Sequence, residues 1–319
     1  MRLRRGPRQN ALTFRAGALV GGRYRIVRLL GAGGMGEVFE AYDTLIESLV
    51  ALKTLRGAHG TLDPSDVANL RREAQVARKV KHQNVCRVLR YGTHKATAAA
   101  QPLPFIVMEK IAGEPLSDYC KTIGTLSSTR VYHVALQACA GLAAIHAARA
   151  LHRDIKPDNL FVEHLNGGDK RIKITDFGLA RLTGPGTGAI TLARVGTFAY
   201  MAPEVLAGKA ASPSSDVWSM GVTLYQLLTG QLPERNHAGR PRFPRPVPGV
   251  WVPVLTRCLA ADKSRRYPSA IELLCDLRAM QGKSPPRPLR QRLLLKRQRW
   301  APVMLGVCIG TLAALLLRW

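Results

Sequence analysis

One stretch decides how this sequence folds, and it reads LHRDIKPDNLFV over Leu151–Val162. Within it, Asp154, Lys156 and Asn159 bring together a carboxylate, an ammonium group and a side-chain amide, and apolar residues bound them on both sides. Asp176-Phe177-Gly178 follows on the next segment and adds a second carboxylate. Carboxylate and amide oxygens bind Mg²⁺, and an ammonium group neutralises phosphate oxygens. The combination therefore suits the binding of a metal–phosphate unit.

The composition is that of a globular protein from a reducing compartment. The 319 residues, of which 46% are hydrophobic, suffice for one large domain with two lobes or for two small domains. The six cysteines are scattered without a Cys-x-x-Cys pair. This spacing indicates neither a zinc site nor a disulfide framework.

A net charge of +26 raises the question of a nucleic-acid or anionic-membrane partner. About half of the excess lies in the flanks, because residues 1–15 hold five arginines and residues 283–299 hold seven Lys/Arg, in both cases without an acidic residue. No basic motif interleaved with aromatic residues supports nucleic-acid binding. We therefore expect no specific nucleic-acid partner.

Three motifs resemble those of protein kinases. Residues 152–159 resemble the catalytic loop of that family, and residues 176–178 resemble its metal-binding loop. Residues 31–38, GAGGMGEV, would also fit a dinucleotide-binding turn, but that turn must open a helix, and the residues that follow here are of β type. The resemblance is to bacterial Hanks-type serine/threonine kinases and implies an α+β fold. Its two lobes are a small, mainly β N-lobe with one regulatory helix and a larger, mainly α C-lobe.

Lys53 and Glu73 are charged residues in apolar settings. Lys53 shares one face of the apolar strand 49–55 with Ala51, where it either meets an anion or reaches to water at a sheet edge. Glu73 lies on the apolar face of a helix that is expected to run from Asp63-Pro64 to about residue 80. On helix statistics alone Glu73 would be solvated. The resemblance instead implies a Lys53–Glu73 ion pair.

The resemblance also implies an ATP site between the lobes. Met108 would be the gatekeeper, and residues 109–111 would form the hinge whose backbone contacts adenine. The expected ATP-binding residues are Leu30, Gly31, Ala32, Gly33, Gly34, Met35, Gly36, Val38, Ala51, Lys53, Glu73, Met108, Glu109, Ile111, Phe161 and Asp176. The implied cofactors are ATP and Mg²⁺, with Mn²⁺ as an alternative metal.

The catalytic roles follow from the same resemblance. Asp154 would accept the proton of the substrate hydroxyl, and Lys156 would neutralise the transferring phosphate. Asn159 and Asp176 would be the metal ligands. A lysine at position 156 is typical of kinases that act on Ser or Thr. Farther along the chain, buried Asp216 is expected to bind backbone amides of the catalytic loop, and Arg266 is expected to pair with Glu204.

Residues 179–195 have no periodicity and are interpreted as an activation segment. Arg153, next to Asp154, predicts a cationic pocket for a phosphorylated residue of this segment. The candidate phosphosites are Thr183, Thr187 and Thr191. Residues 235–250 depart from the family, because a short Arg/Pro-rich run replaces a longer helical region.

The flanks complete the predicted organisation. Residues 1–22 are expected to be a basic disordered arm, followed by the kinase domain over 23–281, with an N-lobe of 23–109 and a C-lobe of 110–281. A basic juxtamembrane linker over 282–299 then precedes a transmembrane helix over 300–319, for which a buried core helix is the alternative. The preceding basic residues predict a single-pass inner-membrane protein with a cytoplasmic kinase domain.

The predicted transmembrane helix carries small residues at intervals of four positions, at Gly306, Gly310 and Ala314. This spacing permits close helix–helix approach and suggests a homodimer. A second hypothesis of a different class, a membrane-tethered pseudokinase scaffold, would require the loss of a catalytic residue. Lys53, Asp154, Asn159 and Asp176 are all present, so an active kinase is favoured. The protein substrates are not predicted.

Overall fold

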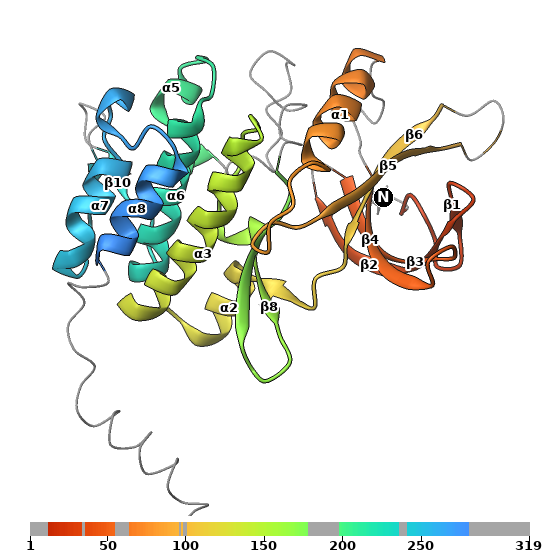
Figure 1. Ribbon diagram of the computed structural model, residues 1–319, viewed down its shortest axis with the longest axis horizontal. Coiled ribbons are helices and arrows are strands. Elements are labelled where there is room, and N and C mark those ends of the chain that lie inside the picture. The colour runs from red at the N-terminus through yellow and green to blue at the C-terminus, as the bar shows by residue number, and fades with distance from the viewer. Residues whose placement is uncertain are drawn as a thin grey trace, which may run out of the picture. The chain divides into compact units, whose positions relative to one another are not determined.

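The computed structural model describes residues 12–33, 36–54, 64–95, 97, 101–177, 198–235 and 241–280 (Figure 1). The chain divides into two units, Met1–Arg278 and Ala279–Trp319, and both lobes of the fold belong to the first. None of the described helices is long and apolar enough to cross a membrane. The predicted transmembrane helix, residues 300–319, and the linker before it lie outside the described residues.

The N-lobe is an antiparallel sheet with one helix. Its strands lie in the order β1-β2-β3-β4-β6-β5. They are β1 (Leu19–Val20), β2 (Tyr24–Gly33), β3 (Gly36–Asp43), β4 (Ser48–Thr54), β5 (Val88–His94) and β6 (Leu103–Glu109). The helix is α1 (Pro64–Ala77), which lies beside β5 (Figure 1). The predicted small β lobe with one helix is confirmed.

The alternation of residues along β4 builds a core on each face of this sheet. Val50 and Leu52 belong to a buried cluster together with Phe39 and Phe105. Ala51 points the other way and belongs to a second cluster, which includes Leu70 of α1. Period-2 alternation sends successive side chains to opposite faces, so the predicted common face of Ala51 and Lys53 follows from the strand itself.

The N-lobe begins earlier in the chain than the predicted boundary at residue 23. Phe14 is 8% exposed, packs against the rings of Phe39 and His94, and so belongs to the N-lobe core. Val20 is fully buried in β1, which pairs with β2. The expected disordered arm is therefore wrong for residues 12–22, because an aromatic and an aliphatic side chain anchor this stretch. Residues 1–11 lie outside the described part of the chain.

The C-lobe consists mainly of helices around α6. The described helices are α2 (Leu116–Ile123), α3 (Ser128–Ala147), α5 (Pro203–Leu206), α6 (Pro213–Thr229), α7 (Val252–Cys258) and α8 (Ala270–Ala279). A sheet in the order β7-β8-β9 joins them, with β7 (Gly113–Pro115), β8 (Leu160–His164) and β9 (Lys170–Ile174). Short 3-10 turns occur at η1 (Pro157–Asn159), η4 (Gly249–Trp251) and η5 (Lys263–Arg265). The two-lobed α+β prediction is thereby confirmed.

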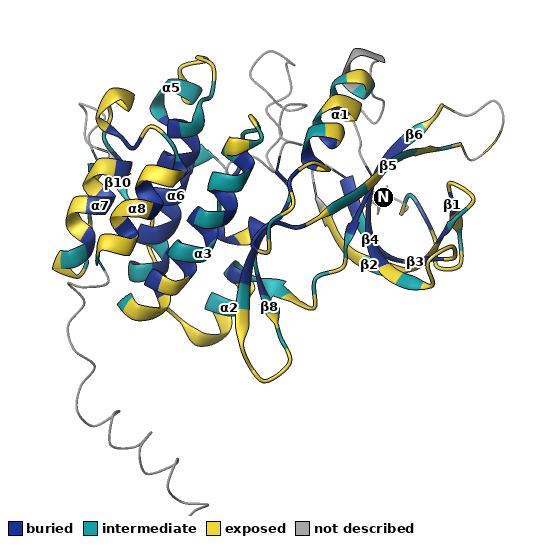
Figure 2. Cartoon of the chain, viewed as in Figure 1, coloured by how far each residue is buried: buried dark blue, intermediate teal, exposed yellow. Residues whose placement is uncertain are grey.

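Helix α6 is buried over almost its whole length (Figure 2). Pro213 at its first turn and a capping box between Ser212 and Ser215 fix its start, and Gly230 in the left-handed conformation ends it. The sequence predicted this burial from a helix that is apolar on nearly all sides. Such a helix gives Asp216 a rigid, water-poor position.

The Arg/Pro-rich departure forms a short hairpin of β10 (Glu234–Arg235) and β11 (Pro241–Arg242). Phe243 stacks on the buried ring of Tyr225, with the ring centroids 5.1 Å apart. The Tyr225 hydroxyl accepts from Arg245 N at 2.9 Å. The described residues 241–248 contain no helix, so this surface differs from a longer helical region, as the sequence indicated.

The predicted Arg266–Glu204 ion pair is confirmed and is bidentate. Arg266 Nη1 and Nη2 lie 2.8 and 2.9 Å from the two carboxylate oxygens, and the guanidinium is fully buried. Arg266 Nε also donates to the carbonyl oxygen of Ala260. Burial alone would raise the pKa of Glu204, but the hydrogen bonds from Arg266 and Ser215 hold that pKa below its usual value. The pair fastens the first turn of α5 to the C-terminal part of the lobe.

Glu204→Gln is expected to destabilise the domain by about 3 kcal/mol, because it leaves a buried guanidinium without its counter-charge. The folded pKa of Glu204 is lowered, so its contribution is complete above the usual value of 4.5 and is lost as the pH falls through the folded value. Urea denaturation of the full chain at several pH values measures the effect. Asp118→Asn, which breaks the exposed pair with Lys121, is the control and should cost at most about 0.5 kcal/mol. Equal effects of the two variants would contradict the structural role of Glu204.

Candidate active site

The catalytic loop is held by one buried carboxylate. Asp216 Oδ2 accepts from His152 N at 2.8 Å, and Oδ1 accepts from Arg153 N at 2.7 Å. Arg153 adopts a φ of +69°, a region that is unfavourable for residues other than glycine. Hydrogen bonds to consecutive amides stabilise this conformation, so the prediction for Asp216 is confirmed.

His146 supports Asp216 from the opposite side. Its Nδ1 accepts from Ala270 N at 3.3 Å, so Nε2 carries the proton and donates to Asp216 Oδ2 at 3.0 Å. Burial opposes ionisation of Asp216, but the hydrogen bonds from His146 and from the backbone amide of His152 keep its pKa below the usual value. The start of α8 is thus connected through His146 and Asp216 to the catalytic loop.

His152 links the catalytic loop to the segment that carries Asp176. Its Nδ1 accepts from Asp154 N at 3.2 Å, and its Nε2 donates to Thr175 O at 2.8 Å. The ring is fully buried, and burial lowers the pKa of His152, which keeps the imidazole neutral. A single tautomer therefore satisfies both contacts and joins the two loops.

Asp154 has one oxygen engaged and one without a partner. Its Oδ2 accepts from Asn159 Nδ2 and Lys156 Nζ, both at 2.9 Å. Its Oδ1 is buried and has no hydrogen-bond partner in the described part of the chain. An oriented carboxylate oxygen without a partner is able to accept a proton from an incoming hydroxyl group.

Asn159 and Asp176 are brought together by backbone contacts. Thr175 N donates to the carbonyl oxygen of Asn159 at 2.9 Å, so Asp176 directly follows a residue that is hydrogen-bonded to Asn159. The Asn159 amide nitrogen donates twice to Asp154, which leaves its Oδ1 as the atom suited to a metal. One carboxylate and one amide oxygen fit Mg²⁺ or Mn²⁺ when phosphate oxygens complete the shell. No group of three or more His, Cys, Asp or Glu side chains forms a separate metal cluster among the described residues.

The ion pairs of Lys53 and Glu73 differ from the prediction. Lys53 Nζ lies 2.8 Å from Asp176 Oδ1, whereas Glu73 Oε1 accepts from Arg153 Nη1 at 3.3 Å. Burial opposes ionisation of Asp176, and the charge of Lys53 holds its pKa below the usual value. The expected Lys53–Glu73 ion pair is wrong for this structure, because each side chain finds a different counter-charge from the catalytic or metal-binding loop.

The other expected nucleotide-binding residues differ in burial and in the elements that carry them. Ala51 and Met108 are buried in one cluster, against which Val38 and Ile111 pack. Leu30, Gly31 and Ala32 are exposed at the end of β2, and Phe161 is half-buried on β8. Of the predicted glycine-rich loop, Gly34 and Met35 lie outside the described residues, as does Gly178 of the metal-binding loop.

Gly36 is required at the point where the glycine-rich hairpin meets β4. Its φ is +132°, and a Cβ atom at this position would lie 2.0 Å from the carbonyl oxygen of Thr54. The next residue, Glu37, donates its backbone N–H to Thr54 Oγ1 at 3.0 Å. The hairpin therefore lies directly on the residue after Lys53, so close that no side chain fits between them.

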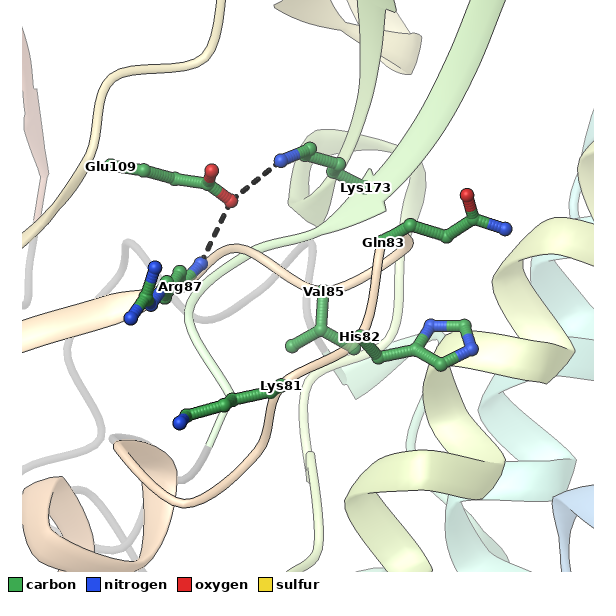
Figure 3. A pocket seen from close by; sticks show the side chains of 7 residues that line it. All are labelled: Lys81, His82, Gln83, Val85, Arg87, Glu109 and Lys173. Atoms are coloured by element: carbon green, nitrogen blue, oxygen red, sulfur yellow. Dashed lines mark hydrogen bonds and ion pairs between the residues drawn. The ribbon is translucent and has the colours of Figure 1, made fainter.

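The hinge has ionic contacts that the sequence did not reveal. Glu109 Oε1 accepts from Lys173 Nζ at 2.7 Å and from Arg87 N at 2.9 Å (Figure 3). These groups line a cavity of about 250 Å³, whose further walls come from Lys81, His82, Gln83 and Val85. On another side of the hinge, Lys110 pairs with buried Glu40. A signal was available in the sequence for Glu40 and Lys173, because each is a charged residue between apolar neighbours of a strand. The same signal identified Lys53.

Comparisons with known proteins agree with this geometry. The family model described as protein kinase domain matches residues 24–275. The serine/threonine-protein kinase PknB of Mycobacterium leprae is 35% identical over 279 residues, covering 83% of this chain and 44% of that protein. PknA of Mycobacterium tuberculosis is 33% identical over 288 residues, covering 86% of this chain and 65% of that protein. The chain thus spans about half to two thirds of the length of these relatives.

A solved structure supports the fold as well. The kinase domain of PknI from Mycobacterium tuberculosis superimposes with a TM-score of 0.66 at 25% identity and covers 83% of this chain and 99% of that domain. The likeness extends over both lobes, in agreement with the elements described above. The uncovered share of this chain is of the size expected for the two flanks.

Asp216→Asn is expected to loosen the catalytic loop, because one acceptor oxygen becomes an NH₂ group facing a backbone donor. An unpaired buried donor costs about 1–3 kcal/mol, so the amides of His152 and Arg153 should exchange with deuterium at least about tenfold faster. Hydrogen-exchange mass spectrometry on the full chain measures this. Asp262→Asn, which alters an exposed cap at η5, is the control. Unchanged protection of the catalytic loop in Asp216→Asn would contradict the assigned role.

Proposed function

This chain belongs to the protein kinase family, and on that premise we propose that it is a serine/threonine protein kinase that transfers the γ-phosphate of ATP to Ser or Thr hydroxyls of proteins. The observation that carries the proposal is the state of Asp154. One carboxylate oxygen is fixed by Asn159 and Lys156, and the other is buried and has no hydrogen-bond partner among the described residues.

Asp154 positions the acceptor. Its Oδ1 accepts the hydrogen bond of the substrate hydroxyl and takes up the proton late in the transfer. An ordinary carboxylate suffices, because the loose transition state of phosphoryl transfer asks little of base strength. Lys156, 2.9 Å from the other oxygen, places a positive charge beside the transferring group. A lysine in this place also supports Ser or Thr as acceptor, and the relatives PknA and PknB are named serine/threonine-protein kinases.

ATP binds between the lobes in this proposal. Mg²⁺, held by Asp176 and Asn159, would neutralise phosphate charge, with Mn²⁺ as an alternative. Lys53 supplies a further cation whose ammonium group is buried against Asp176. Ala51 and Met108 provide buried apolar surface for the adenine ring, and the backbone of the hinge provides its hydrogen bonds. These residues bind and orient the nucleotide, and positioning is most of what the reaction requires.

Regulation by autophosphorylation is part of the proposal. The candidate sites Thr183, Thr187 and Thr191 lie outside the described residues. The support comes from Arg153, whose guanidinium is partly exposed and contacts Glu73. Arginine binds phosphate oxygens in a bidentate manner and more strongly than it binds a single carboxylate oxygen at 3.3 Å. A phosphorylated threonine would therefore find a cation beside the catalytic loop.

We expect wild-type protein to transfer radiolabelled phosphate from ATP to serine- and threonine-containing protein substrates and not to tyrosine. Asp154→Asn should lower the rate by about 10²–10⁴-fold, because the proton acceptor is lost while the size of the side chain is kept. Phosphoamino-acid analysis identifies the acceptor. Mass spectrometry of the same samples tests residues 179–195 for phosphate.

Asp158→Asn is the matched control, since Asp158 lies in the same loop but is exposed. Its rate should stay within about twofold of the wild type, as is usual for exposed positions. An Asp154→Asn enzyme as active as this control would refute the proposed mechanism. Wild-type protein without phosphate between residues 179 and 195 after incubation with Mg-ATP would refute the autophosphorylation proposal.

A membrane tether is the last part of the proposal. It is supported by the uncharged run Ala301–Leu317, by Trp300 and Trp319 at its ends, and by the basic stretch that precedes it. The enzyme would then be a single-pass inner-membrane protein with a cytoplasmic kinase domain. Gly306, Gly310 and Ala314 would form the contact face of a homodimer.

Fractionation of cells tests this tether. The full chain should sediment with the inner membrane and resist extraction at high pH, whereas a chain ending at residue 281 should stay in the supernatant. Gly310→Leu should lower crosslinking of the membrane form, because a large side chain keeps the helices apart. Recovery of the full chain in the supernatant would refute the tether, and crosslinking unaffected by Gly310→Leu would refute the dimer.

A further inference from the structure

Glu40 is a buried carboxylate at the edge of the nucleotide region. Its exposed fraction is only 4%, and it lies in β3 between the buried apolar residues Phe39 and Ala41. It accepts from Arg28 Nε at 2.5 Å and also pairs with the ammonium group of Lys110. A carboxylate removed from water is stable only when such partners satisfy it. Lys110 belongs to the hinge, so this ion pair connects the sheet to the hinge.

The strand register places Glu40 on the same face of the sheet as the expected adenine-binding residues. Glu40 lies opposite Ala51, and Ala51 lies opposite Met108. Directly opposed residues of antiparallel strands point to the same face. Val38, two positions before Glu40, shares this face as well and packs against the cluster of Ala51 and Met108. The Glu40–Lys110 pair therefore lies on the side of the sheet where the nucleotide is expected.

The neighbouring hinge residue is bound in another direction. Glu109 contacts Lys173 of β9 and accepts a hydrogen bond from the backbone N–H of Arg87 (Figure 3). The Nζ atom of Lys173 also lies 3.6 Å from Glu163 of β8. Lys110 contacts the N-lobe sheet through Glu40. Glu109 is thus tied to both lobes, through Arg87 and Lys173, and Lys110 adds a contact with the N-lobe sheet. This arrangement fixes the backbone between them more firmly than the strand pairing of β6 alone.

We propose that Lys110 is a positioning residue for ATP, which fixes the hinge against the N-lobe sheet through its ion pair with Glu40 and thereby raises the affinity for the nucleotide. The inference rests on the proposed kinase function and assigns a role within the same site. A hinge whose backbone is already held in place loses less conformational entropy when adenine binds. The smaller entropy loss makes ATP binding tighter. The hydrogen-bond partners of the γ-phosphate and the substrate do not change, so the rate of transfer is unaffected.

Arg23 and Asp43 provide a matched control pair. Asp43 ends β3, the strand that carries Glu40, and Arg23 directly precedes β2, the strand that carries Arg28; Asp43 is as deeply buried as Glu40. Asp43 accepts from Arg23 Nε and Nη2 at 2.6 and 2.7 Å. Asp43 stands at the far end of β3, opposite Ser48, and within the described part of the chain its side chain contacts Arg23 and Leu45 and not the hinge. Removing its charge therefore tests the effect of lost N-lobe stability without loss of a hinge contact.

The experiment compares the full chain as wild type, Lys110→Met, Lys110→Arg and Asp43→Asn. Calorimetric titration with Mg-ATP gives Kd, steady-state assays give kcat and KM, and thermal unfolding gives Tm. We expect Lys110→Met to weaken ATP binding about tenfold with kcat within about twofold, in line with the loss of a hydrogen bond to a charged group. Lys110→Arg should restore most of the affinity, and Asp43→Asn should lower Tm and leave Kd unchanged.

The outcomes separate this inference from the proposed function. An unchanged Kd in Lys110→Met, or an equal loss in Asp43→Asn, would overturn the role of Lys110 and leave the kinase proposal intact. Failure of Lys110→Arg to recover affinity would also overturn it, since an arginine can form the same ion pair. A wild-type protein that binds no Mg-ATP would overturn the kinase proposal and this inference with it.

Discussion

The active site depends on the hydrogen bonds that Asp216 forms from within α6. A carboxylate in a helix that is buried on nearly all sides must find donors, and here the donors are the amides of His152 and Arg153. Through these two bonds a helix that is buried over almost its whole length determines the course of the catalytic loop. Asp154, Lys156 and Asn159 come soon after these two residues in the sequence. The position of the Asp216 carboxylate therefore helps to fix the distances among the three side chains.

The same physical requirement explains how the rest of the site is arranged. Three further buried charges of the described residues are stabilised by an opposite charge, as seen for Glu204 with Arg266, for Lys53 with Asp176 and for Glu40 with Lys110. Each pair joins segments that are distant in sequence. Because a buried charge needs a particular partner, these pairs specify which distant segments meet. Apolar packing alone would specify this less strictly.

Much of this organisation could be predicted from the sequence, because some signals are local. The period-2 pattern of β4 placed Ala51 and Lys53 on one face, and the apolar surroundings of Asp216 demanded buried donors. Phe14 was missed because the arginines around it suggested a disordered arm, although a single aromatic side chain is enough to anchor a short segment. The Glu40–Lys110 pair was missed because Lys110 looks like an ordinary surface charge, and a charged residue between apolar neighbours, such as Glu40, does not name its partner until the strand register is known.

The pairing of Lys53 shows where sequence reasoning reaches its limit. Lys53 and Arg153 are two cations, and Glu73 and Asp176 are two anions, within one partly buried region. Lys53 could pair with either anion while Arg153 pairs with the other, and both arrangements neutralise all four charges. The requirement for a counter-charge therefore does not decide between the two arrangements. The choice depends on where α1 lies relative to β4, which is set by packing over the whole lobe. A sequence can therefore identify the members of such a network, whereas their partners are a property of the conformation.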